Sequence, residues 1–198
     1  QDSEGELWIG SWEEGLFRVK ADGAIKNFKY NAKNPHSLSS NFVRACCEDN
    51  LGNIWIGTFN GLNRYNKITG LFQNHTASDT QADGLTHSSI WCIVKDNQGT
   101  LWLGTYFGGV NYFNPEYEIY TRYSYSSNEK KGLSNPVVGR TIEDKDGNLW
   151  IGTEGGGLNY YNRRTREFKW YRPQEGRNSI SHNNVKALYY DADKEIIW

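Results

Sequence analysis

A short segment with a central tryptophan recurs along the chain at nearly constant spacing. Its clearest copy spans residues 144–153 and reads Asp-Lys-Asp-Gly-Asn-Leu-Trp-Ile-Gly-Thr. Successive copies are 47, 47, 48 and 48 residues apart, measured between Trp8, Trp55, Trp102, Trp150 and Trp198. A period in this range indicates repeated supersecondary units. We therefore expect residues 1–198 to form one array of repeats rather than several unrelated domains.

The residue types in this segment predict a tight turn followed by a buried strand. Asp and Asn bond their own backbone in turns, Gly supplies a positive φ, and the Leu-Trp-Ile run favours a strand. The Gly after that run lets a neighbouring backbone come close. Asp144, Asp146 and Gly147 also resemble part of a calcium loop. Other copies carry Leu51 and Gln98 in place of Asp146, however, so we interpret the segment as a turn without a metal.

Each repeat divides into four short strands, and the second repeat serves as the example. Its expected strands are Val43–Glu48, Ile54–Thr58, Leu62–Asn66 and Leu71–His75. A polar loop then leads to the next repeat, and no segment has the pattern of a helix. Four short strands in each period of roughly 45 residues are typical of β-propeller blades. The predicted fold is therefore all-β, with about four blades of four antiparallel strands.

The strand count also suggests that this array is a part of a larger propeller. The tryptophan segment begins five times, but only four first strands precede its copies. If four blades closed into a ring, Trp198 would need the strand position that Trp8 already holds. We therefore expect further blades, to a total of about seven, within the range of known propellers.

Composition excludes several classes of function. The chain has 22 Lys and Arg against 23 Asp and Glu, which is not the basic balance of a nucleic-acid-binding protein. No apolar run approaches the ~18 residues that a membrane-spanning helix needs. Cys46, Cys47 and Cys92 have neither the even number of a disulfide framework nor zinc-site spacing. Nucleophile elbows and phosphate-binding loops are also missing, so we expect no catalytic residue, cofactor or metal.

Residues 144–162 resemble the two-component regulator propeller repeat. That repeat runs from an Asp-x-x-Gly-Asn turn through Leu-Trp-Ile-Gly-Thr to Gly-Gly-Leu-Asn-x-Tyr-Asn, and residues 49–66 match it with one residue fewer. The loop at residues 34–41, Asn-Pro-His-Ser-Leu-Ser-Ser-Asn, matches the connection between repeats. The resemblance covers essentially the whole chain. One departure is Lys194, which we place at the position of the turn Gly in the last copy.

This resemblance implies an extracytoplasmic sensor. Such propellers form the periplasmic region of membrane-anchored hybrid two-component histidine kinases of Bacteroidetes, which control polysaccharide utilisation and act as dimers. The resemblance thus implies an oligosaccharide ligand, with the remaining blades, the kinase of the same receptor and a second copy as partners. These residues carry none of the kinase apparatus, so we expect the segment itself not to be an enzyme.

One face of the predicted propeller collects residues that differ between repeats while the framework stays constant, as a binding surface on a repeated scaffold would. These positions enter the first strands or join the second strand to the third. They are Trp12, Arg44, Phe59, Trp91, Tyr106, Arg140, Glu154 and Lys186. Aromatic rings pack on a pyranose, and basic groups bind uronate or sulfate. Alternatively, the rings pack between blades and the basic residues are solvated charges.

Two other functions remain open from the sequence. A propeller lyase or glycoside hydrolase would use paired carboxylates, for which Glu13 and Glu14 are adjacent, although neighbours on a strand point to opposite faces. A structural or dimerisation platform would bind no ligand directly. His87 and His182 occupy equivalent loop positions, where we expect loop hydrogen bonds rather than a metal.

Overall fold

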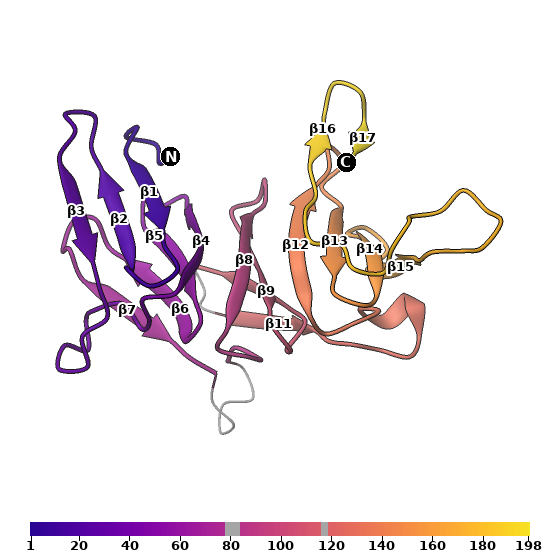
Figure 1. Ribbon diagram of the computed structural model, residues 1–198, viewed down its shortest axis with the longest axis horizontal. Coiled ribbons are helices and arrows are strands. Elements are labelled where there is room, and N and C mark those ends of the chain that lie inside the picture. The colour runs from indigo at the N-terminus through magenta and orange to yellow at the C-terminus, as the bar shows by residue number, and fades with distance from the viewer. Residues whose placement is uncertain (78–83, 116–118) are drawn as a thin grey trace.

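A computed structural model of the protein describes residues 1–77, 84–115 and 119–198. In these residues the strands form antiparallel sheets that follow one another in chain order (Figure 1). The first blade has three strands, β1 (Leu7–Gly10), β2 (Leu16–Val19) and β3 (Ile25–Phe28). The second blade has four strands, β4 (Val43–Glu48), β5 (Ile54–Thr58), β6 (Gly61–Tyr65) and β7 (Phe72–His75).

The third and fourth blades repeat the four-stranded sheet. The third consists of β8 (Ile90–Lys95), β9 (Leu101–Thr105), β10 (Val110–Asn114) and β11 (Ile119–Tyr123). The fourth consists of β12 (Val138–Glu143), β13 (Leu149–Thr153), β14 (Gly157–Asn162) and β15 (Glu167–Tyr171), and a short hairpin follows it, β16 (Tyr190–Asp191) and β17 (Ile196–Ile197). These sheets confirm the predicted all-β propeller blades.

The first strand of each complete blade is the innermost one. β4, β8 and β12 lie next to one another, and the later strands of each sheet lead away from them. The first blade and the β16–β17 hairpin lie on opposite sides of the molecule, and their strands do not pair (Figure 1). The described sheets thus form an open series of blades, as the prediction of a partial propeller requires.

An aspartate holds each blade's first turn and the strand after it. Asp49 Oδ1 accepts hydrogen bonds from the backbone N–H groups of Leu51 and Asn53, each at 2.9 Å. Its Oδ2 accepts from Trp55 Nε1 at 2.7 Å. The same aspartate–indole bond occurs at Asp2–Trp8, Asp96–Trp102 and Asp144–Trp150. This arrangement gives Asp144 the turn role expected of it, and the described residues contain no acidic, His or Cys cluster that could hold a metal.

The glycine after the buried strand lets neighbouring blades approach. A Cβ added to Gly57 would lie 2.7 Å from Ile90 Cγ2 of the next blade, and one added to Gly104 would lie 2.6 Å from Val138 Cγ1. Real Cβ atoms do not come this close to such groups. The repeated glycine is therefore fixed by the packing between blades.

The polar loops between blades are locked by a buried asparagine on the third strand. Asn63 Oδ1 accepts from the backbone N–H of Ser39 at 2.8 Å, and its Nδ2 donates to Ser39 Oγ at 2.9 Å. Leu38, the residue before this serine, is fully buried. The same lock joins Asn111 to Thr86 and Asn159 to Ser134.

Two local expectations were wrong. The loop before β12 contains a 3-10 helix, η1 (Glu129–Lys131), which is stabilised by Asn128 Oδ1 accepting from the N–H of Lys130. In the last turn the positive φ of 55° belongs to Glu195 rather than to Lys194, so Glu195 stands in place of the glycine. Among the described residues, none of the helices has the length and apolarity to cross a membrane.

Candidate functional site

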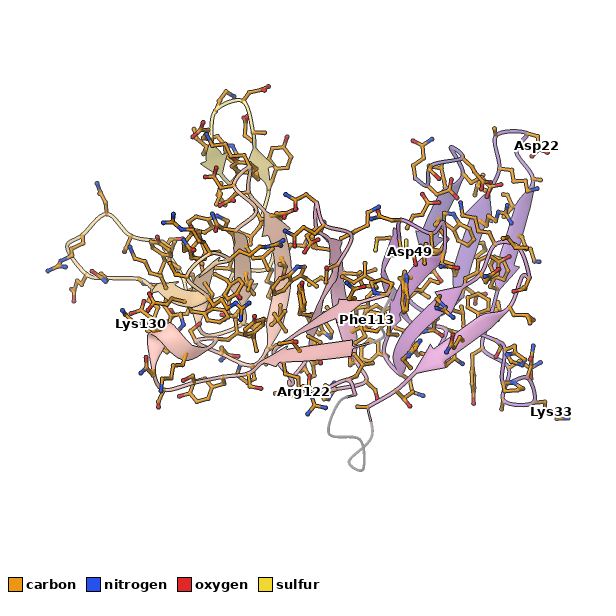
Figure 2. All side chains as sticks on the ribbon, turned by 180° about the vertical axis from the view of Figure 1, so that it is seen from behind. Asp22, Lys33, Asp49, Phe113, Arg122 and Lys130 are labelled. Atoms are coloured by element: carbon orange, nitrogen blue, oxygen red, sulfur yellow. The ribbon has the colours of Figure 1, made fainter. Side chains whose placement is uncertain are left out.

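The two ends of each blade carry different kinds of connection. Asp22, in the turn between β2 and β3, lies at the opposite end of the first blade from Lys33, in the loop after β3 (Figure 2). We call these the turn end and the loop end. In an antiparallel sheet, the connection from the second strand to the third and the entry to the first strand share one end. That shared end is the loop end.

The eight predicted site residues all belong to the loop end. Phe59, Tyr106 and Glu154 follow the second strand of their blades, and Trp12 follows β1, the equivalent strand of the three-stranded first blade. Arg44, Trp91 and Arg140 lie near the starts of β4, β8 and β12. Lys186 precedes β16. The equivalence of the repeats thus indicates the end of the blades at which these residues lie, where they divide into three groups.

Arg44 forms the centre of the first group. Its guanidinium carbon lies 4.6 Å from the ring centroid of Trp12, 4.7 Å from that of Phe59 and 4.2 Å from that of Trp91. The Trp91 ring is stacked on Tyr106 with a centroid separation of 5.0 Å. We call these five side chains the Arg44 cluster. A cation held among several aromatic faces is stabilised by the ring quadrupoles.

The Arg44 cluster contains unsatisfied hydrogen-bond donors. Arg44 Nε and Trp91 Nε1 are both buried, and neither has a partner among the described residues. Burial lowers the pKa of the Arg44 guanidinium, an effect that the charges of Glu154 and Tyr106 partly offset. Buried donors of this kind normally find partners. The cluster therefore has unmet capacity to donate hydrogen bonds.

Arg140 approaches the Arg44 cluster from the inner strands. The two arginines line one cavity of about 250 Å³, together with Gly10, Ala45, Cys46 and Ile93. Arg140 itself is exposed. In β12 the residue that corresponds to Arg44 is Gly139, and Arg140 is the next residue. Arg140 nevertheless lines the same cavity as Arg44. The cavity is basic because both of its charged residues are arginines.

Glu154 and Lys186 form the third group. The carboxylate of Glu154 lies 3.7 Å from Lys186 Nζ, and Lys186 is mostly exposed. Glu154 also attracts Arg44 electrostatically. The predicted residues of the fourth blade and of the following hairpin therefore join the site through charge rather than through ring contacts.

Sequence reasoning missed Phe42. Its ring contacts Trp12 and Phe59 edge-on, with centroid separations of 5.7 and 5.5 Å. It lies two residues before Arg44 and contacts the same two rings as that residue. The pairing of β4 with β5 shifts register between Val43 and Ala45, so strand alternation in the sequence gives no signal for Phe42.

The histidines act as loop acceptors, as predicted. His87 Nδ1 accepts from the N–H of Ser89 at 3.0 Å, and His182 Nδ1 accepts from the N–H of Asn184 at 2.9 Å. His87 also lies near the exposed ring of Phe107, with a centroid separation of 6.2 Å. These two histidines thus make hydrogen bonds within the loops at the loop end.

Comparison with solved structures identifies the fold. The extracellular domain of a putative hybrid two component system from B. thetaiotaomicron is similar at 19% identity with a TM-score of 0.69, over 99% of this chain and 30% of that chain. Virginiamycin B lyase from Staphylococcus aureus is similar at 13% identity with a TM-score of 0.71, over 100% of this chain and 60% of that chain. This chain thus spans 30% and 60% of these two structures. None of the curated proteins matches it.

A family comparison matches the repeats themselves. The family described as two component regulator propeller matches residues 37–60, 84–107 and 132–155. Each match begins in the loop that the buried asparagine locks, and continues through the first strand, the aspartate turn and the second strand. The matched segments therefore contain the features that build each blade, and the chain carries three copies of the two-component regulator propeller repeat.

Proposed function

We propose that this chain is a ligand-sensing module of an extracytoplasmic two-component receptor and that its loop end binds an oligosaccharide. The Arg44 cluster carries this proposal. Trp12 is 58% exposed and Phe59 is 39% exposed, so ring surface remains accessible beside the half-buried Arg44. Rings of this kind pack on the apolar face of a pyranose, while nearby donors fix its hydroxyls. Arg44 and Arg140 would favour a uronate or sulfate group.

The three repeat copies support the cellular context of the proposal. The module would lie in the periplasm, and the remaining blades would complete the binding face. A histidine kinase in the same receptor would transmit the signal and regulate polysaccharide utilisation, and the receptor would act as a homodimer. The segment itself would bind rather than catalyse.

Glycan binding to the complete receptor ectodomain tests the proposal. Binding of neutral, uronate-containing and sulfated oligosaccharides is measured by calorimetry for the parent protein and for Arg44→Ala, Trp91→Ala and Arg140→Ala. We expect each substitution to weaken binding by about 2 kcal/mol, as for central Trp and Arg anchors. Arg140 is exposed, so its variant should stay folded. Lys20→Ala removes an exposed positive charge at the turn end and should leave affinity unchanged.

The outcomes separate the three candidate functions. Unchanged affinity in all three loop-end variants would show that this face is not the binding site. New reducing ends or unsaturated products would instead identify a glycoside hydrolase or a lyase. An ectodomain that binds no glycan while the receptor still responds in cells would point to a structural platform that relies on a partner protein.

A further inference from the structure

A second cavity lies at the turn end, between the third and fourth blades. Its volume is about 320 Å³, and we call it the interblade pocket. Its lining includes Trp102, Tyr112, Tyr123, Tyr161, Arg163 and Arg166. Arg163 and Arg166 belong to the turn between β14 and β15, at the end of the blade opposite Glu154. The pocket is therefore separate from the loop-end site.

Two cavities at the turn end of the other blade interfaces are much smaller. A cavity between the first and second blades, lined in part by Asp2 and Trp8, has a volume of about 30 Å³. One between the second and third blades, lined in part by Asp49 and Pro115, has about 40 Å³. The interblade pocket reaches the lower end of the volume range of small-molecule sites, ~300–1,000 Å³. The repeat scaffold alone thus does not require a space of this size.

Arg166 occupies a position that favours glycine. The turns at residues 66–70 and 162–166 have the same hydrogen bonds, with the fifth residue's N–H donating to the carbonyl of Asn66 or Asn162 at 2.8 Å in both. The fifth residue is Gly70 with φ 71° in the second blade, and Arg166 with φ 60° in the fourth. Residues other than glycine are strained in this region. In the fourth blade Arg166 adopts this strained backbone conformation, and its side chain lines the pocket.

Arg163 supplies the second guanidinium of the pocket. Its Nη2 donates to Asp96 Oδ2 at 2.9 Å and lies 3.4 Å from Glu143 Oε1. Lys67, the equivalent residue of the second blade, makes the matching ion pairs with Asp2 and Glu48. The arginine adds an Nε that is buried and has no partner among the described residues. Lys67 has no donor that corresponds to this Nε.

The pocket wall carries an excess of positive charge. Its lining contains two arginines and no carboxylate. Asp96 and Glu143, which do not line the pocket, pair with Arg163, whereas Arg166 is exposed and forms no ion pair within the described residues. The hydroxyls of Tyr123 and Tyr161 are bonded to each other at 2.7 Å. Burial raises the pKa of Tyr161, so its phenol stays neutral and does not offset the charge.

We infer that the interblade pocket binds a small ring-bearing monocarboxylate. The carboxylate would be held by Arg166 and by the free Nε of Arg163, because guanidinium groups form strong charge-assisted hydrogen bonds with carboxylates. The rings of Tyr112 and Tyr123, both only half-buried, would pack against the ring of the ligand. Arg166, which forms no ion pair within the described residues, offers a single guanidinium, and this fits one carboxylate better than a polyanion. The ring is either aromatic, as in benzoate, or saturated, as in a uronic acid.

Two acids and their neutral counterparts test this inference. Benzoate and glucuronate are titrated at low salt into the protein, with benzyl alcohol and glucose as controls, and the Trp102 indole and arginine Nε signals are followed by NMR. We expect saturable binding of at least one acid and none of its neutral counterpart. The acid that binds identifies the type of ring. Binding of neither acid at up to about 10 mM would overturn the inference.

Two variants in the same turn test whether Arg166 is the charge that binds the acid. Arg166→Gly restores the residue type of the second blade, so its unfolding midpoint should be unchanged or raised, but its affinity for the acid should fall at least about tenfold. Arg164→Ala removes an equal charge from an exposed neighbour outside the pocket and should keep its affinity. Equal losses in the two variants would mean diffuse electrostatic attraction. That result, or unchanged affinity in Arg166→Gly, would contradict the assigned site.

Discussion

At the residue scale, each turn aspartate satisfies several donors at once. Asp49 accepts from two backbone N–H groups and from the indole of Trp55, a tryptophan that is fully buried. A buried indole N–H without an acceptor would carry the full cost of its desolvation. The aspartate therefore allows the largest side chain of the repeat to enter the core.

Removing one of these aspartates should destabilise its blade strongly. Asp49→Ala leaves the buried indole of Trp55 and two turn N–H groups without acceptors, so we expect a loss of about 3 kcal/mol in the free energy of unfolding. Asp144→Ala should cost less, because Trp150 is only half-buried. Urea denaturation of both variants measures the difference. Equal losses would show that burial of the indole does not set the cost.

The cysteines should make the fold sensitive to alkaline pH. Burial raises the pKa of the Cys47 thiol to about 12, and it also raises that of Cys92. Unfolded thiols ionise near ~8.5, so above that pH the unfolded state binds fewer protons than the native state. Stability should therefore fall by up to about 1.4 kcal/mol per pH unit for each thiol. Urea midpoints measured between about pH 8 and 9.5 test this slope.

A variant without these two thiols is the control for the pH prediction. Cys47→Ala combined with Cys92→Ala should flatten the alkaline slope, although its overall stability will be lower. The same slope in the variant and in the parent protein would assign the effect to other groups.

The structural roles of residues were predictable from the sequence where the repeats agree. The turn role of Asp144 followed from comparison of the copies, and so did the loop role of His87. The contact of Phe42 with Trp12 did not, because it joins two blades through rings whose orientation depends on packing. The hydrogen bond that the Trp55 indole donates to Asp49, six residues earlier, could not be predicted either, because no turn rule specifies it.

At the element scale, the strands were predictable because their spacing repeats. The expected strand Val43–Glu48 agrees with β4, and Ile54–Thr58 agrees with β5. The 3-10 helix η1 was missed because it is a single turn without hydrophobic periodicity. The interblade pocket was also beyond prediction, since its volume depends on how two sheets meet.

Close packing between sheets makes the strand glycine sensitive to substitution. Gly57→Ala would bring a methyl group to 2.7 Å from Ile90 Cγ2, so we expect a loss of about 1–3 kcal/mol. Ile90→Ala alone should cost about 2–5 kcal/mol through the cavity it leaves. The double variant should be more stable than the sum of the two losses predicts, because the new methyl group occupies part of that cavity. Additive losses in thermal or urea unfolding would contradict this packing argument.

At the scale of the whole molecule, the first blade exposes an unpaired edge. β1 is an edge strand of its sheet, and Leu7 and Ile9 on it are 45% and 49% exposed. Exposed apolar edge strands favour association. The 198-residue polypeptide studied alone should therefore self-associate, with a sedimentation coefficient that rises with concentration. A single monomeric species at all concentrations would contradict this prediction.

The interfaces between blades differ although the blades themselves are alike. Lys67 pairs with Asp2 and Glu48 at the first interface, whereas Arg163 pairs with Asp96 at the third. At the second, Pro115 replaces the basic residue, and Phe113 packs on Trp55. Neighbouring repeats of similar sequence are prone to pair with the wrong partner while they fold. The contacts differ at each interface, so each blade packs best against its native neighbour. This favours assembly of the blades in a single order.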